Sequence, residues 1–401
     1  MPITFDFQQF LEDGARGRRT LSEAIRGMTA SACGSIDAEA LTESVLLEPR
    51  LIGWHFGPAS RAVPIEQLLF RILPHDINRE IEVGSGESGA ITLPGIGSVE
   101  TALPNARLRL SRRSGENAFD VRGPGGPVQC TFSERRNVPG TAIELIEEMD
   151  AVVKGFLSQN IGGHEQITIV RARRELMANL SRALILVEKH LPRIAELLRR
   201  SVQAILLFEH PTLNSFAALQ MHGMIFLNVR RGATVLFFVD GLVHQGGHVV
   251  FSEATLERQM YFKVSPDESL QTITGRRDGR TAYEALHGLY TECALLEAFS
   301  GLGRADLDVS ERQELAARTG FVLRRFRTDM RLMQEHAKAV LSHHGEPLFE
   351  YFAEKLRHFD TLAAPDTSDY SGHADDFDFS AFLKQNPGWQ ASRRSLIEEE
   401  S

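Results

Sequence analysis

The apolar stretch "TVLFFVDGLVHQGGHVVF", residues 234–251, limits the fold more than any other part of the sequence. It is mostly hydrophobic and too long for a single strand, so it predicts a helix inside a protein core. Its two histidines, His244 and His248, are four residues apart and would share one face of that helix. Burying a polar group without a partner is costly. The stretch therefore predicts either a metal site or two hydrogen-bonded histidines in the core or at its rim.

The composition is that of a globular protein. The chain has 401 residues, of which 42% are hydrophobic and 24% charged, so it can form a sizeable core and is not disordered as a whole. Its formal net charge of -9 gives no global attraction to nucleic acid or to an anionic membrane. The start lacks the pattern of a signal peptide, and no segment has 18 uncharged apolar residues in a row. We expect a cytoplasmic protein without nucleic-acid or membrane partners.

Changes in the residue pattern along the sequence predict four parts. Residues 1–75 contain short helical patterns that follow Ser, Asp or Pro. Residues 76–140 have short alternating runs separated by Gly, Pro and Asn, which is typical of small antiparallel strands. Residues 141–365 return to a helical period, and residues 366–401 form an acidic, turn-rich tail. The predicted class is α+β, mainly helical, with a zincin-like metal-binding helix and a small β-rich subdomain.

The third part contains three further signals. The segments "SVQAILLFEH" and "HGMIFLNV" predict two strands just before the histidine helix. Pro192 should kink or split the long helical pattern that precedes them, because proline removes a backbone donor. The basic segment 318–340 predicts a helix with a solvated charged face, and binding of an acidic peptide is the alternative.

The spacing of His244 and His248 is weak support for a metal site when taken alone. Fourteen histidines placed at random in a chain of this length would give about 0.5 such pairs. The context adds a preceding strand and a following helix with His287, which together suggest the zincin arrangement of edge strand, metal helix and third-ligand helix. The three cysteines are far apart, so a metal must rely on His, Asp or Glu. Carboxylates compete with His287 as third ligand, and Glu284 could instead orient its ring; the competitors are Glu253, Glu284 and Glu292.

Gln245 limits the chemistry of such a site. Zinc peptidases have a glutamate after the first histidine, which accepts a proton from metal-bound water. Glutamine cannot accept that proton, so peptide hydrolysis by the usual route is disfavoured. The remaining choices are an inactive site, a structural metal, or oxidation by iron(II) with an α-keto acid and dioxygen, which needs no carboxylate base. Gly246 and Gly247 each cost about 1 kcal/mol in a helix, so a closely packed neighbour or a ligand should compensate.

Three stretches resemble the peptide-modifying proteins named for an HExxH motif, which are proposed α-ketoglutarate-dependent peptide β-hydroxylases of ribosomal peptide pathways. The stretches are "SFAALQMHGMIFLN", "LVHQGGHVVF" and "SPDESLQTITGRRDGRTAYEALHGLY", and the likeness covers about residues 205–300. Gln245 departs from the glutamate of that family. The resemblance implies iron(II) bound by His244, His248 and His287, with α-ketoglutarate (2-oxoglutarate) as co-substrate and zinc as the alternative metal.

An α-keto acid needs a cation at its far carboxylate, and arginine suits this role because its planar fork binds a carboxylate bidentately. The candidates are Arg276, Arg277 and Arg280, of which we favour Arg280. A peptide substrate could add to the strand "HGMIFLNV", with His222, Asn228 and Gln245 as candidate contacts. The preferred function is hydroxylation of a carbon of a peptide or a peptide-linked amino acid, and the expected partner is a peptide or a carrier-linked amino acid. The alternatives are a zinc hydrolase with another base and an inactive zincin-like binding protein.

Overall fold

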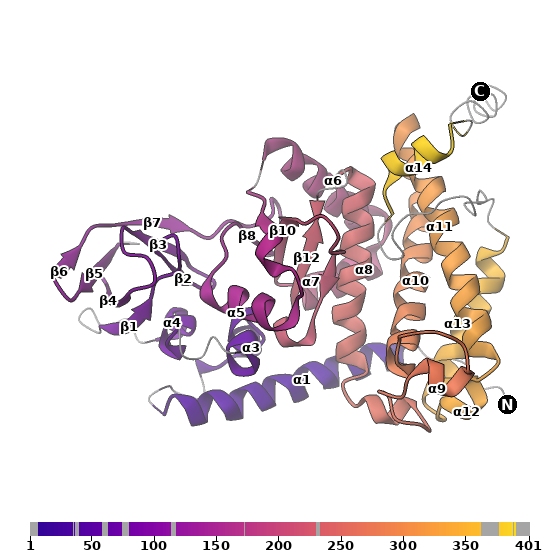
Figure 1. The fold of residues 1–401 in the computed structure, drawn as a ribbon, viewed down its shortest axis with the longest axis horizontal. Coiled ribbons are helices and arrows are strands. Elements are labelled where there is room, and N and C mark those ends of the chain that lie inside the picture. The colour runs from indigo at the N-terminus through magenta and orange to yellow at the C-terminus, as the bar shows by residue number, and fades with distance from the viewer. Residues whose placement is uncertain are drawn as a thin grey trace. The chain divides into compact units, whose positions relative to one another are not determined.

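The computed structural model describes residues 7–34, 36, 40–57, 63–73, 80–113, 118–171, 173–229, 233–361, 377–387 and 389. Helices make up 56% and strands 16% of the structure, which confirms the predicted mainly helical α+β class. The chain divides into two compact units, whose elements are labelled in Figure 1. Unit 1 comprises Met1–Gly17, Arg174–Arg200 and Val229–Ser401, and unit 2 comprises Arg18–Arg173 and Ser201–Asn228. The four predicted parts, with boundaries at residues 75, 140 and 365, are stretches of sequence and not spatial units, and this division stays a prediction.

The β-rich part predicted for residues 76–140 consists of two small antiparallel sheets in unit 2. One has the strand order β1-β4-β5-β6 and the other β2-β3-β7. Their shared core contains Val83, Ile91, Val99 and Leu110. The strands are β1 (Ile81–Gly84), β2 (Ala90–Leu93), β3 (Gly97–Thr101), β4 (Arg107–Arg112), β5 (Phe119–Gly123), β6 (Gly126–Val128) and β7 (Cys130–Glu134).

A third, mixed sheet of unit 2 contains both strands predicted before the histidine helix. These are β10 (Ala204–Glu209) and β12 (Met224–Asn228), which pair in parallel. The sheet order is β11-β12-β10-β8, with β9 paired to β10. The helix expected from residue 141 starts ten residues later, because Glu144–Ile146 extends the sheet as strand β8. The other elements are β9 (Thr168–Ile169), β11 (Phe216–Ala217) and α5 (Ala151–Asn160).

Strand β12 is not an edge strand, which corrects one expectation. Strand β10 pairs with one side of β12, and β11 pairs with the other side at Ile225 and Phe226. The rings of Phe216 and Phe226 stack with their centroids 4.4 Å apart. A peptide could therefore add to β12 over these positions only by displacing β11. The short strand β11 was missed because two residues carry no readable alternation.

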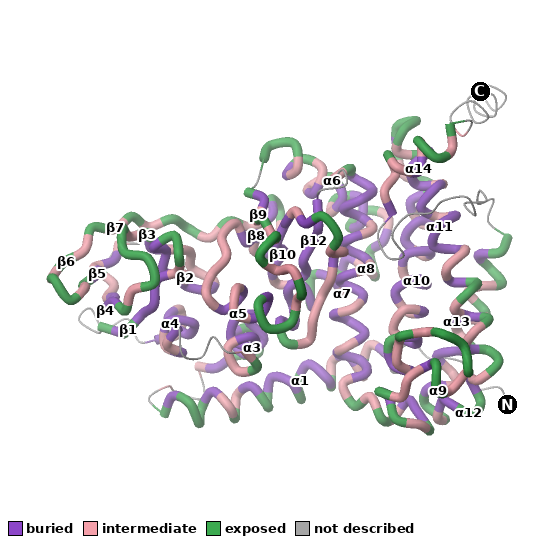
Figure 2. Tube along the Cα trace, in the orientation of Figure 1, coloured by how far each residue is buried: buried purple, intermediate pink, exposed green. Residues whose placement is uncertain are grey.

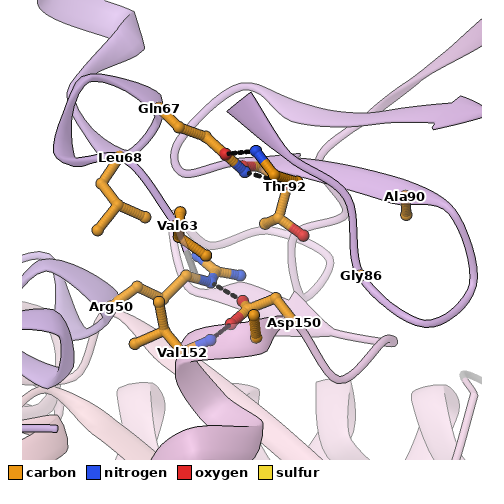
Figure 3. A pocket seen from close by; sticks show the side chains of 11 residues that line it. Arg50, Val63, Gln67, Leu68, Gly86, Ala90, Thr92, Asp150 and Val152 are labelled. Carbon is orange, nitrogen blue, oxygen red and sulfur yellow. Dashed lines mark hydrogen bonds and ion pairs between the residues drawn. The ribbon is translucent and has the colours of Figure 1, made fainter. Parts of the chain in front are cut away.

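Short helices complete unit 2 around a buried arginine. Arg50 is 2% exposed and contacts three carboxylates: Glu48, Glu144 at 2.6 Å and Asp150 at 2.7 Å. Figure 3 shows Arg50 and Asp150 on one side of a small pocket and Gln67 on the other. This cluster joins α3 to β8 and to the start of α5. The helices are α2 (Glu43–Leu46), α3 (Pro49–Phe56), α4 (Ile65–Leu68), η3 (Phe70–Ile72), η4 (His164–Gln166) and η5 (Leu219–Met221).

Unit 1 is helical in the part of the chain that the structure describes. Of the kink or split predicted at Pro192, the structure has the split, since α6 ends at His190 and the proline begins α7. The helices that lie wholly or mainly in this unit are α6 (Arg174–His190), α7 (Pro192–Ser201), α8 (Val235–Ala254), η7 (Arg258–Tyr261), α9 (Leu270–Thr274), α10 (Ala282–Leu302), α11 (Val309–Gln334), α12 (Ala337–Val340), α13 (Gly345–Phe359) and α14 (Phe379–Gln385). Of the predicted acidic tail, residues 366–376, 388 and 390–401 lie outside the described residues.

The N-terminal region matches its prediction in part. The short helices α2, α3 and α4 agree with the predicted short helical patterns, but the region begins with one helix of 26 residues, α1 (Phe7–Ala32), which contributes to both units. This helix continues through Gly14 and Gly17, although glycine inside a helix is unfavourable. Gly17 faces the backbone of Glu253 so closely that any Cβ would overlap the Glu253 carbonyl oxygen. A tertiary contact therefore explains this glycine, and the sequence around it does not reveal that contact.

The predicted histidine helix is α8. Its first turn is capped by Thr234, whose side-chain oxygen accepts a hydrogen bond from the backbone N–H of Phe237 at 3.0 Å. Figure 2 shows buried positions along most of its length. Helix α8 is long and apolar enough to cross a membrane, but 78% of its apolar window is buried inside the structure. That burial is the pattern of a core helix.

Candidate metal centre

Three predicted imidazoles lie together in unit 1. His244 and His248 come from α8, and their ring centroids are 4.9 Å apart. His287 comes from α10, and its ring centroid is 4.3 Å from that of His248. Nδ1 of His248 and Nε2 of His287 are 2.8 Å apart, a hydrogen-bond distance. Two helices separated by 27 residues of chain thus bring the three rings into one cluster.

A close crossing of α8 and α10 allows this approach. A Cβ at Gly247 would lie 3.4 Å from Cγ2 of Thr291 and 3.7 Å from Cε1 of Tyr290. These are van der Waals contacts, so a side chain larger than alanine would push the helices apart. The crossing therefore leaves room for a methyl group at Gly247, so it does not by itself explain why this position is glycine.

Aromatic side chains fix the ring of His287. Phe251 stacks on it with a centroid distance of 4.7 Å and an interplanar angle of 20°. Tyr283 meets it edge-on at 5.5 Å, and the Tyr283 hydroxyl shares a hydrogen bond of 2.9 Å with Thr255. The guanidinium of Arg258 lies 4.1 Å from the centroid of the Tyr283 ring. The orientation of the third imidazole is therefore set by packing before any ligand binds.

The surroundings keep all three imidazoles neutral at pH 7. Burial, the Arg325 guanidinium and His287 together lower the pKa of His244 to about 3. Burial, followed by the charges of His244 and Arg325, lowers the pKa of His248. Burial and the charges of His248 and Arg258 lower the pKa of His287. Neutral imidazole is the form that binds a metal, and each of the three histidines keeps an intermediate exposure to solvent.

The donor set fits a transition metal, although the rings do not all point at one place. Two nitrogens bound to one ion at about 2.0 to 2.1 Å lie about 2.8 to 3.4 Å apart for right-angle to tetrahedral geometry. The nitrogens of His248 and His287 meet this spacing. Among the described residues, however, no three His, Cys, Asp or Glu side chains form a group that could hold a metal ion in their present orientations. Binding by all three imidazoles would therefore require at least one ring to rotate.

The glutamates that compete with His287 as third ligand lie in other surroundings. Glu284 is exposed, and its side chain accepts the backbone N–H of Thr281 at 2.7 Å in a capping box that starts α10. Glu253 is buried in the last turn of α8, where its backbone meets Gly17. Glu292 is buried and ion-paired with Arg325 at 3.2 Å. His287 is thus the side chain that the structure places directly beside His248.

Of the three arginines predicted to bind a co-substrate, two are ion-paired with carboxylates and the third is exposed. Arg280 holds Asp329 with both terminal nitrogens of its fork and also contacts Asp278 at 2.8 Å. Its Nη1 lies 3.8 Å from where a Cβ of Gly288 would be, next to the third histidine in the chain. The other two arginines lie in the same loop: Arg276 pairs with Glu335, and Arg277 is exposed.

The predicted substrate contacts are buried. His222 and Asn228 are each 2% exposed and belong to unit 2. The side-chain amide of Asn228 donates to the carbonyls of His210 at 2.8 Å and Leu213 at 2.6 Å, which fixes the loop after β10. Gln245 is 3% exposed in α8. Their roles in binding a substrate stay predictions.

Sequence reasoning missed two arginines of α11 that lie inside unit 1. Arg318 contacts Asp240 of α8 at 2.6 Å, and Arg325 contacts Glu292 of α10. The two arginines are seven residues apart, so they share one face of the helix. The buried residues Phe321, Val322 and Phe326 lie between or beside them. The recurrence of arginine among apolar residues was the sign in the sequence that one face of this helix points into the unit.

Comparison with models of known protein families finds no match, and comparison with curated proteins finds none either. The function of the cluster must therefore be argued from its own chemistry.

Proposed function

We propose that the chain is a non-haem iron oxygenase that uses α-ketoglutarate to hydroxylate a carbon of a peptide or a peptide-linked amino acid. The observation that carries the proposal is the cluster of three neutral imidazoles from α8 and α10. Their number and type suit a metal with open positions for other ligands. Gln245 favours oxidation over hydrolysis, because the amide next to the first histidine cannot take a proton from water.

His244, His248 and His287 are the residues that would hold iron(II). When bound there with an α-keto acid and dioxygen, iron supplies the oxidising power for attack on a C–H bond. The chain's own contribution is to keep the imidazoles neutral by burial and to fix the ring of His287 between Phe251 and Tyr283.

The proposed partner is a peptide, either free or linked to a carrier, and the proposed location is the cytoplasm. The support for both is indirect. The net charge of -9 disfavours nucleic acid and anionic membranes, and the apolar helix α8 is mostly buried. The resemblance around residues 205–300 supplies the peptide class. Arg280 would bind the far carboxylate of α-ketoglutarate only after releasing Asp329, so that assignment does not fit the site as it stands.

A two-step assay tests the proposal. The full chain is loaded anaerobically with iron(II), its metal content is measured, and α-ketoglutarate and dioxygen are then added while succinate is followed. We expect one iron per chain and succinate that depends on iron and disappears in His244→Ala. Zinc retention with peptide cleavage in the absence of dioxygen would instead establish the hydrolase, and a folded chain that binds neither metal would establish the binding protein. Either result overturns the proposal.

A further inference from the structure

The outward face of the sheet β1-β4-β5-β6 in unit 2 carries a group of arginines. On β4 the side chains of Leu108 and Leu110 lie in the core of the β-rich part. Successive side chains of a strand point to opposite faces, so the residues beside these leucines point outward. The residue after β4 continues the pattern, since its backbone N–H donates to the carbonyl of Ala118 at 2.9 Å. The arginine face consists of the outward residues Arg107, Arg109, Arg113 and Arg122.

Two residues of the arginine face stand directly opposite each other. Arg109 and Arg122 are partners in the antiparallel register of β4 and β5, and like charges at such positions are unfavourable for a sheet. Glu80 contacts both guanidinium groups, at 3.7 Å from Arg109 and 3.3 Å from Arg122. The segment 107–113, "RLRLSRR", contains four arginines and no acidic residue. The sheet thus carries positive charge where its own stability does not require it, which favours a role in binding.

The arginine face is accessible to a partner. Its side chains are 50% to 72% exposed, and they make ion pairs with carboxylates of the same sheet. Ion pairs this exposed contribute little to stability, so carboxylates of a partner can replace them at small cost. The pairs are Arg107–Glu82, Arg109–Glu80, Arg122–Glu80 and Arg113–Asp120.

The spacing along β4 suits an extended chain. Alternate residues of a strand are about 7 Å apart, and Arg107, Arg109 and Arg113 occupy such positions on one side of β4. An extended peptide repeats its side chains on one side at the same interval. Both neighbours of β4 are already paired to it, since it lies between β1 and β5. A peptide can therefore lie along this strand only on its face, held through side chains.

The chemistry of the face favours an acidic polypeptide over nucleic acid. Proteins that bind single-stranded nucleic acid on a sheet usually stack its bases on aromatic side chains. The one aromatic residue of these four strands, Phe119, is buried in the core. The net charge of the whole chain, -9, also disfavours nucleic acid.

We infer that the arginine face binds an extended polypeptide segment with Asp or Glu at alternate positions. Each guanidinium makes charge-assisted hydrogen bonds to a carboxylate, and its planar fork can hold both carboxylate oxygens. The cross-strand pair of Arg109 and Arg122 widens the positive surface beyond a single strand. This binding needs no metal and is independent of the proposed oxidation.

Fluorescence anisotropy of the full chain with a labelled peptide of six Asp–Thr repeats tests the inference. We expect binding that weakens as salt is added. The double variant Arg109→Gln/Arg122→Gln should weaken it about 10-fold, or about threefold for each arginine. The matched control Arg136→Gln/Arg171→Gln removes two exposed, ion-paired arginines of unit 2 outside this sheet and should leave the affinity unchanged.

Two further probes identify the ligand. A peptide of six Asp followed by six Thr should bind at least about threefold more weakly, because only every second aspartate of a consecutive run faces the sheet. The thermal midpoint of the variant Arg109→Gln/Arg122→Gln should not fall, since the substitution removes a like-charged pair.

Three results would overturn the inference. The first is absence of peptide binding to the unaltered chain. The second is equal affinity of the Arg109→Gln/Arg122→Gln variant and its control, or of the two peptides. The third is a twelve-nucleotide oligouridylate that binds more tightly than the peptide and loses affinity in the same variant, which would assign the arginine face to nucleic acid.

Discussion

His248→Ala lowers the affinity of the chain for a divalent transition metal by about 100-fold or more, because it removes the imidazole closest to both other rings. The ring of His248 lies 4.9 Å from that of His244 and 4.3 Å from that of His287. Competition with a chelator of known affinity measures the loss. His244→Ala and His287→Ala should show losses of the same order.

The control for these variants is His358→Ala, which removes an exposed histidine near the end of α13 and should leave the affinity unchanged. A different pattern would assign different roles. If His287→Ala retained full affinity while the other two variants lost it, His287 would be a hydrogen-bonding partner of His248 and not a ligand. If all variants matched the unaltered chain, the three histidines would be polar residues at the rim of the core.

Gly17→Ala destabilises the protein by about 2 kcal/mol or more, a cost typical of an overpacked site. The added methyl group would overlap the carbonyl oxygen of Glu253, and a backbone atom cannot swing aside as a side chain can. Helix α1 would have to move away from the last turn of α8. Urea denaturation measures the free energy of unfolding.

Gly14→Ala on the same helix is the matched control. A Cβ at Gly14 meets no described atom within 4 Å, so the substitution should stabilise the protein by up to about 1 kcal/mol through helix propensity. Equal effects of the two substitutions would show that the contact with Glu253 does not hold α1 in place.

The elements that could be predicted have strong local signals. Helix α8 is long, apolar and preceded by a capping threonine, and strands β10 and β12 are short apolar runs. Pro192 marks the break between α6 and α7 for a purely local reason. Helix α1 was mispredicted because its glycines argue against a continuous helix, whereas packing against α8 overrides that local preference.

In the candidate site, too, features set by nearby residues could be predicted, whereas contacts with residues far along the chain could not. The histidine pair could be found because a spacing of four is a local property of a helix, and the order of the surrounding motifs pointed to His287. The ion pair between Arg280 and Asp329 could not be predicted, because Asp329 lies 49 residues further along the chain. Arg325 was overlooked because the whole basic segment was assigned to a solvated face, although the apolar residues between Arg318 and Arg325 indicated that one face of the helix points inward.

X-ray absorption spectroscopy of the anaerobic, iron-loaded full chain tests most directly whether three imidazoles bind one ion. We predict one iron per chain with three histidine nitrogens at about 2.1 Å and the remaining positions filled by oxygen, and two histidine nitrogens in His287→Ala. Two or fewer histidine nitrogens in the unaltered chain, with the same number in His287→Ala, would contradict the shared centre.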